Sequence, residues 1–272
     1  MTETVGGAAL RDPAWVTARI AEMGRSWGTD SCRAAGTLWW CMVASALVQP
    51  VVRAYVAAAP VPAVELDRIN CPVRADGGIE TVLLPADPPA ASDLAPAAAQ
   101  PGDTAPVAPA SATPASATPA SATPASATPA PAALAPVAPA SAERALFRRA
   151  ANSPAPDTRA AAQALRASLA SVIATVAQAS GAGIPALWAV VADAIGNRAI
   201  DAGAPAIAPT LAHDVGGKLP TPRFQEVAGR TFVKRISCCL VFEAPGCAMC
   251  TSCPKRPAAE REQLLTALTT GN

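Results

Sequence analysis

The chain has 272 residues, of which 51% are hydrophobic and 15% charged, and its formal net charge is +1. This balance argues against a nucleic-acid partner, because nucleic-acid-binding proteins usually carry a clustered basic face. The length allows one or two domains with a sizeable core, although only four Phe, one Tyr and five Trp are available as large anchors.

The N-terminal residues predict an intracellular chain that begins with a helix. Residues 1–7 lack the basic and apolar regions of a secretory signal. Asp12 followed by Pro13 is typical of a helix start, since Asp is a good N-cap and Pro is favoured at the first helical position. We therefore expect a helix through Arg25.

A second, mostly buried helix is predicted from Cys32 to about Val56, kinked or ended near Pro50. Its apolar run, Ala34–Val48, has 15 residues. A helix needs ~20 apolar residues to cross a bilayer. The sequence therefore favours a core helix and no stable membrane insertion.

A small hairpin is predicted after this helix. Val64–Asn70 alternates in polarity, Asp76-Gly77-Gly78 is a turn signal, and Ile79–Leu84 follows as a second strand-like run. Residues 1–84 thus form an N-terminal helical segment with a hairpin.

Residues 85–140 differ in composition from the rest of the chain. They are rich in Pro and Ala, and Ser111–Ala130 consists of four tandem copies of Ser-Ala-Thr-Pro-Ala. Frequent prolines forbid a continuous helix, and there is almost no large apolar side chain to bury. We expect a disordered, extended linker with polyproline II character.

Residues 141–229 predict a second helical segment that packs with the first. A short helix is expected at 141–150, a long one over 157–180 and another over 184–196, while residues 206–230 are predicted to be rich in loops.

Residues 230–272 predict a C-terminal module with a strand-like start at 230–237 and a short helix over 260–269. The expected fold is therefore mainly α with small β elements (α+β). It comprises a helical body, a small hairpin and a C-terminal cysteine cluster.

That cluster contains Cys238, Cys239, Cys250 and Cys253 in the spacing C-C-x10-C-x2-C, with Cys247 inside the interval. In a reducing cytoplasm, clustered cysteines indicate metal or redox chemistry. Thiolates select zinc, copper(I) or iron–sulfur iron. The vicinal pair differs from the common zinc knuckles, and the C-x2-C-x2-C run echoes part of the [4Fe–4S] ferredoxin pattern. Zinc, an iron–sulfur cluster and a redox dithiol all stay open on the residues alone.

Other catalytic machinery is scarce. His213 is the only histidine, which leaves no basis for a Rieske centre and little for a catalytic triad. No Gly-rich nucleotide-binding motif is present. We therefore expect no catalytic residue beyond the metal centre, and an external electron donor if the protein is a redox enzyme.

The cysteine spacing, preceded by Arg235 and Ser237 and followed by Pro254, resembles the C-terminal [2Fe–2S] module of the ferric-siderophore reductases, the FhuF-like family. Helical stretches at 33–50 and 186–194 are also similar to that family, whereas the Pro/Ala-rich segment has no counterpart in it.

The resemblance implies that Cys238, Cys239, Cys250 and Cys253 ligate a [2Fe–2S] cluster, with zinc or [4Fe–4S] as alternatives. Cys247 departs from the family pattern and is interpreted as a bystander. The implied reaction is one-electron reduction of siderophore-bound Fe(III).

The same resemblance implies a ferric siderophore as substrate and a ferredoxin or flavin reductase as electron donor. The expected location is the cytoplasm, either free or peripheral to the inner membrane. Arg33, Trp39 and Arg235 are candidates for substrate contact. Two other hypotheses are a zinc-stapled helical binding protein and an iron- or redox-responsive regulator.

Overall fold

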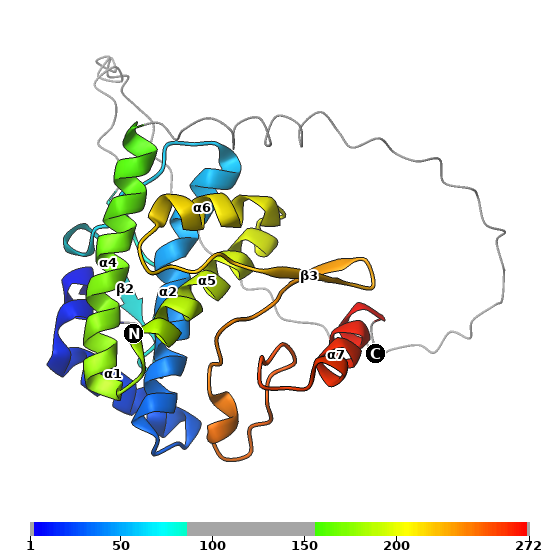
Figure 1. Cartoon of the computed structure of the whole chain (residues 1–272). Helices are drawn as coiled ribbons and strands as arrows, with labels where there is room; N and C mark the ends of the chain where they lie inside the picture. The colour runs from blue at the N-terminus through cyan, green and yellow to red at the C-terminus, as the bar shows by residue number, and fades with distance from the viewer. Residues whose placement is uncertain (1–2, 86–155, 271–272) are drawn as a thin grey trace, which may run out of the picture. The chain divides into compact units, whose positions relative to one another are not determined.

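The computed structural model describes residues 3–85 and 156–270 (Figure 1). The predicted linker, apart from residue 85, and the predicted short helix at 141–150 lie outside these ranges. Within them the protein has six α-helices and two small antiparallel sheets, which confirms the predicted mainly-α fold with small β elements.

The first helix, α1, spans Pro13–Trp27 and confirms the predicted start. The Asp12 side chain accepts a hydrogen bond from the Ala14 backbone N–H at 2.8 Å, which satisfies one of the free donors at the helix N-terminus. Gly28 ends the helix in the left-handed conformation, with φ 65°, where glycine avoids the steric cost of a side chain.

The central helix is α2, Cys32–Ala57, which contacts α1, α4 and α5. Pro50 lies inside it without ending it, in contrast to one of the two predicted outcomes. The Trp40 indole N–H donates to the Leu187 carbonyl at 2.9 Å, so the bulky side chain is buried with its one donor satisfied.

Two long helices pack against α2: α4, Pro156–Ser180, and α5, Ile184–Asp201. Both confirm predicted helices. Along α4 the apolar side chains recur at helical spacing and face the core, as Leu165, Leu169 and Ile173 show.

The helix α6, Ala208–Val215, lies where the sequence predicted loops. It has eight residues, too few to be stable on intrinsic propensity alone. Leu211 and Val215 are fully buried, and the helix packs on α4 and α5. Tertiary packing therefore stabilises a helix that the local sequence does not predict. The last helix, α7, Ala258–Thr270, confirms the predicted terminal helix.

Strand β1, Glu3–Gly6, pairs antiparallel with β2, Asn70–Val73. The predicted hairpin around Asp76–Gly78 is present only as isolated bridges, Val73 with Ile79 and Asn70 with Leu83. The predicted first strand, Val64–Asn70, was wrong over most of its length. It contains a 3-10 turn instead, and its last residue opens β2.

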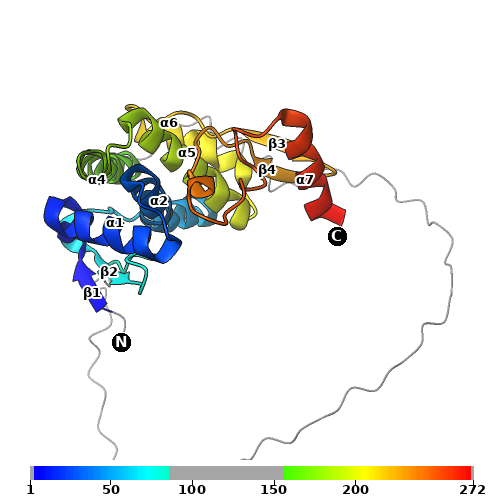
Figure 2. The same ribbon diagram turned by 90° about the horizontal axis from the view of Figure 1, so that it is seen from below.

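Strands β3, Phe224–Val227, and β4, Arg230–Val233, form a second antiparallel pair that contacts α5 through β4 and α7 through β3. Figure 2 shows β1 and β2 next to α1, and β3 and β4 next to α7. The remaining short elements are 3-10 turns: Gly7–Arg11, Leu66–Arg68, Pro205–Ile207 and Val241–Glu243. Strand β4 leads directly into the cysteine segment.

Two helices are long and apolar enough to cross a membrane by length and composition alone: Cys32–Ala57 and Asp157–Ser180. The protein buries 72% of the most apolar stretch of the first helix and 50% of that of the second. Core helices of soluble proteins give the same signal, so the packing of α2 agrees with the predicted buried helix.

Candidate metal centre

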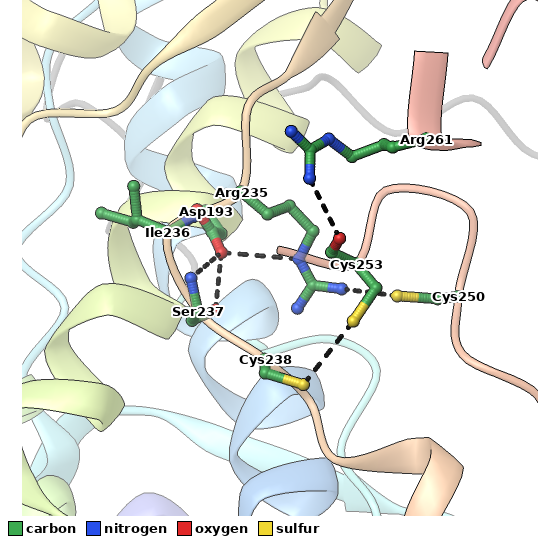
Figure 3. A network of polar contacts seen from close by, with 8 residues as sticks. All are labelled: Asp193, Arg235, Ile236, Ser237, Cys238, Cys250, Cys253 and Arg261. Carbon is green, nitrogen blue, oxygen red and sulfur yellow. Dashed lines mark hydrogen bonds and ion pairs between the residues drawn. The ribbon is translucent and has the colours of Figure 1, made fainter. Parts of the chain in front are cut away.

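A buried carboxylate on α5 anchors the chain just before the vicinal cysteines (Figure 3). Asp193 accepts hydrogen bonds from the backbone N–H groups of Ile236 and Ser237, both at 3.0 Å, and from the Ser237 hydroxyl at 2.5 Å. The Arg235 guanidinium lies 3.5 Å from the same carboxylate. Four donors on three consecutive residues thus fix the segment that enters the cysteine pair.

The backbone turns sharply after Cys239. Leu240 has a left-handed conformation with φ 61°, and a 3-10 turn follows over Val241–Glu243. Adjacent side chains in a strand point to opposite faces, but Cys238 and Cys239 lie outside any strand, and both thiols contact cysteines of the second half of the site. The backbone N–H of Leu240 bonds the Cys238 sulfur, and that of Val241 bonds the Cys239 sulfur.

The second cysteine pair lies in a tight turn, in which the Cys253 N–H donates to the Cys250 carbonyl at 3.1 Å. Two arginines hold this turn from outside. Arg256 donates to the Cys250 carbonyl at 3.1 Å, and Arg261, on α7, donates to the Cys253 carbonyl at 3.4 Å. Arg256, just before α7, and Arg261, on α7, therefore attach this end of the chain to the C-x2-C half of the site.

The four sulfurs form two cross-pairs, each with one member from each half of the site. Cys238 Sγ lies 3.9 Å from Cys253 Sγ, and the Cys239 side chain is hydrogen-bonded to that of Cys250. Arg235 Nη1 lies 3.4 Å from Cys250 Sγ. Within residues 3–85 and 156–270, no three Cys, His, Asp or Glu side chains converge on a single metal position. The sulfur contacts that are present join the two halves of the site.

The local contacts also shift the acidity of the thiols. The hydrogen bond from Cys250 lowers the pKa of Cys239 to about 5. Burial raises this pKa, but the Val241 N–H and the positive charge of Arg235 lower it further. The same bond raises the pKa of Cys250, and burial raises that of Cys238. The thiolate, which is the form that binds metal, is therefore already favoured at one position.

Cys41, on α2, is a further thiol beside this centre. It lies within electrostatic range of Arg235, Cys238 and Cys239, and burial raises its pKa to about 12. The sequence predicted only a buried small side chain here. Nothing in the local spacing shows that α2 passes next to a segment some 200 residues later, because that proximity arises from the packing of α2 on α5.

The predicted residues around the centre fall into two groups. Arg235 contacts it directly, and Arg33 lies near it through an ion pair of 3.3 Å with Glu243. Trp39 is fully buried, donates to the Gly77 carbonyl at 2.8 Å and packs on Trp15. Because no surface of Trp39 is exposed, this side chain packs in the core and has no surface that could contact a substrate.

Cys247 lies in the same segment, but its sulfur has no recorded partner among the residues that the structure describes. Asp193, in contrast, was not predicted. The signal that points to it is its place as the only charged residue in the apolar run 184–196. A charge buried in a helix of that kind needs a partner, and the partner is the cysteine segment.

Comparison with known proteins bears on this segment alone. Residues 235–255 match the family model of the FhuF 2Fe-2S C-terminal domain. No curated protein sequence and no solved structure gives a significant match to the chain. Together with the clustered cysteines, the match identifies residues 235–255 as similar to an iron–sulfur module of the FhuF type.

Proposed function

We propose that the protein is an iron–sulfur oxidoreductase that reduces siderophore-bound Fe(III) to Fe(II). Cys238, Cys239, Cys250 and Cys253 would hold the group, a [2Fe–2S] cluster. The observation that carries this proposal is the match of residues 235–255, which contain all four cysteines, to the FhuF 2Fe-2S C-terminal domain. A dinuclear cluster takes two thiolates at each iron, and four cysteines are its usual ligand set.

The surroundings of the sulfurs also support a redox role. Reduction potentials of iron–sulfur proteins depend on hydrogen bonds to the sulfurs, on net charge and on solvent exposure. Here the backbone N–H groups of Leu240 and Val241 and the guanidinium of Arg235 all face sulfur atoms. These contacts favour additional negative charge at the site, and so favour its reduced state.

When bound, the cluster supplies a single electron to the acceptor. The protein itself needs to hold the cluster, admit the ferric complex and stabilise the extra charge. Hydroxamate and catecholate oxygens are hard ligands that hold Fe(III) far more tightly than Fe(II). One-electron reduction therefore weakens the complex and releases iron, and no proton-transferring side chain is required.

The competing hypothesis is a structural zinc site in a binding protein without redox activity. Zinc in such sites is tetrahedral, with four ligands around one ion. The common zinc knuckles use two C-x(2–4)-C pairs, whereas one half of this site is the vicinal pair Cys238 and Cys239. This spacing, together with the family match at residues 235–255, supports the iron–sulfur proposal over zinc.

The proposal is tested by anaerobic purification followed by iron, acid-labile sulfide and zinc analysis. We expect two irons and two sulfides per chain, a visible charge-transfer spectrum and an EPR signal on one-electron reduction. The reduced protein should then transfer one electron per chain to a ferric trihydroxamate, followed by trapping of Fe(II). A colourless protein with one zinc per chain would contradict the proposal.

Two cysteine variants test the ligand assignment. Cys239→Ser should lose most of the visible absorbance, because it removes a thiolate from one of the cross-pairs. Cys247→Ser is the matched control from the same segment, and we expect its spectrum to equal that of the unmodified protein. Loss of the cluster in the control would show that Cys247 is a ligand.

A further inference from the structure

A carboxylate on the turn after the vicinal cysteines attaches that turn to α2. Glu243 is the last residue of the 3-10 turn Val241–Glu243. The Ser31 hydroxyl donates to Glu243 Oε2 at 3.3 Å, and Arg33 Nη2 donates to Glu243 Oε1, also at 3.3 Å. Figures 1 and 2 both show this turn, in orange, beside the start of α2. One side chain thus connects segments that lie more than 200 residues apart in the sequence.

The attachment point is the N-terminus of the central helix. Ser31 is the N-cap of α2, and its Oγ accepts a hydrogen bond from the Ala34 N–H at 3.2 Å while it donates to Glu243. A negative charge at a helix N-terminus is favoured by the helix dipole. The Arg33 side chain is 58% exposed, and exposed ion pairs contribute little by themselves. The Ser31 hydrogen bond and the helix N-terminus therefore carry much of the attachment.

The same turn carries the N–H groups that face the sulfurs. The Leu240 N–H bonds the Cys238 sulfur, and the Val241 N–H bonds the Cys239 sulfur. The Glu243 N–H donates to the Leu240 carbonyl at 2.9 Å, so the position of Glu243 is linked to that of both donors. Leu240 has a positive φ, which costs free energy and persists only where the surroundings hold it. The Glu243 carboxylate supplies such a hold.

The vicinal pair is thus attached on both sides, each time to a different helix. Asp193, on α5, accepts from the Ile236 and Ser237 N–H groups before the pair, and Glu243 binds the start of α2 after it. Helices α2 and α5 pack against each other, so both attachments belong to one packed framework. Groups that orient metal ligands in this way change metal affinity or activity about 10–100-fold when they are removed.

From these contacts we propose that Glu243 is a positioning residue of the metal centre. Through Ser31 and Arg33 it holds the turn that directs the Leu240 and Val241 N–H groups at the cysteine sulfurs. The effect on the redox centre rests on the proposed function, whereas the attachment of the turn to α2 does not require a cluster.

Two variants of Glu243 separate its position from its charge. Glu243→Gln and Glu243→Ala both lose the negative charge, but glutamine keeps an oxygen that can accept from the Ser31 hydroxyl. Hydrogen exchange measured by mass spectrometry on the full chain reports how firmly the amides of residues 240–243 are held. We expect exchange about tenfold faster in Glu243→Ala, the effect of losing one hydrogen bond to a charged group, and near-normal exchange in Glu243→Gln.

The reduction potential is the second measurement. Because N–H donors to sulfur favour the reduced state, the potential of Glu243→Ala should lie below that of Glu243→Gln, although both lack the same charge. Loss of the cluster from Glu243→Ala alone would support the same role. Glu262→Ala, an exposed acid of α7 with no recorded ion pair among the described residues, is the matched control and should behave as the unmodified protein does.

The outcomes distinguish this inference from the proposed function. Unchanged exchange in Glu243→Ala would overturn the positioning role, even in a protein that holds a cluster and reduces iron. Faster exchange with equal potentials in the two Glu243 variants would also overturn it, because the turn would then not act on the sulfurs. Faster exchange in Glu243→Ala, in a chain that never contains iron, would support the attachment and reject the reductase function.

Discussion

Asp193→Asn is the substitution that most directly tests how the helical body holds the cysteine segment. The carboxylate is buried, with 5% of the side chain exposed, and it accepts from two backbone N–H groups and one hydroxyl while facing Arg235. Asparagine has nearly the same shape but only one acceptor oxygen, and it leaves the Arg235 charge without its counterion.

The expected cost follows from these contacts. A hydrogen bond to a charged group contributes about 1.5–3 kcal/mol, and removing one partner of a buried ion pair costs about 3–5 kcal/mol. Because the Arg235 contact is long, at 3.5 Å, and asparagine keeps one acceptor, we expect a loss of about 3 kcal/mol. For a folded unit of this size that lowers the melting temperature by roughly 9 °C.

The assay combines thermal unfolding with iron and sulfide content. We expect Asp193→Asn to melt lower and to contain less than half of the cluster. Asp201→Asn is the control on the same helix, since its side chain is 62% exposed and makes one surface ion pair with Arg198. Asp193→Asn with unchanged melting and full cluster content would refute the anchoring argument. A lower melting temperature with full cluster content would show that Asp193 contributes to stability but is not needed to shape the cysteine segment.

Two further predictions concern the core. Burial raises the pKa of Cys71 from its ordinary value of 9.0 to about 11, so the thiol contributes stability below pH 9 that is lost as the pH rises toward 11. In denaturant unfolding, Cys71→Ala should reduce the fall in the free energy of unfolding between pH 9 and 11 by up to about 3 kcal/mol. The same pH dependence in both proteins would contradict the raised pKa of Cys71. Gly36→Ala should destabilise the protein by about 1–3 kcal/mol, because a Cβ at this position of α2 would overlap Ser180 Cβ and lie 2.7 Å from its Oγ. Gly6→Ala, with open space around it, should melt as the unmodified protein does, and equal melting of both variants would show that the α2–α4 contact is looser.

Local signals in the sequence predicted most of the helices. Asp12 and Pro13 mark the start of α1, and the apolar spacing of α4 marks its buried face. Such signals act over one or two helical turns, and the structure therefore follows them closely. The cysteine spacing likewise points to the C-terminal module, and the family match at residues 235–255 agrees with it.

What the sequence did not predict depends on contacts between distant residues. Strand β1 pairs with β2 across more than 60 residues, and no local pattern encodes that register. The cross-pairing of Cys238 with Cys253 depends on the turn at Leu240. The role of Asp193 depends on the chain returning to α5 after β4. In each case the tertiary fold, and not local propensity, determines the partner.

The anchoring of the cysteine segment on α5 has a consequence for the order of maturation. The large apolar side chains of the segment, such as Leu240 and Val241, are only partly buried, and the group that shapes its entry, Asp193, belongs to a helix formed earlier in the chain. A nascent chain therefore lacks a shaped cluster site until α5 has packed on α2. With the proposed cluster, iron insertion would follow correct folding of the helical body, and chains with a misfolded body should be colourless.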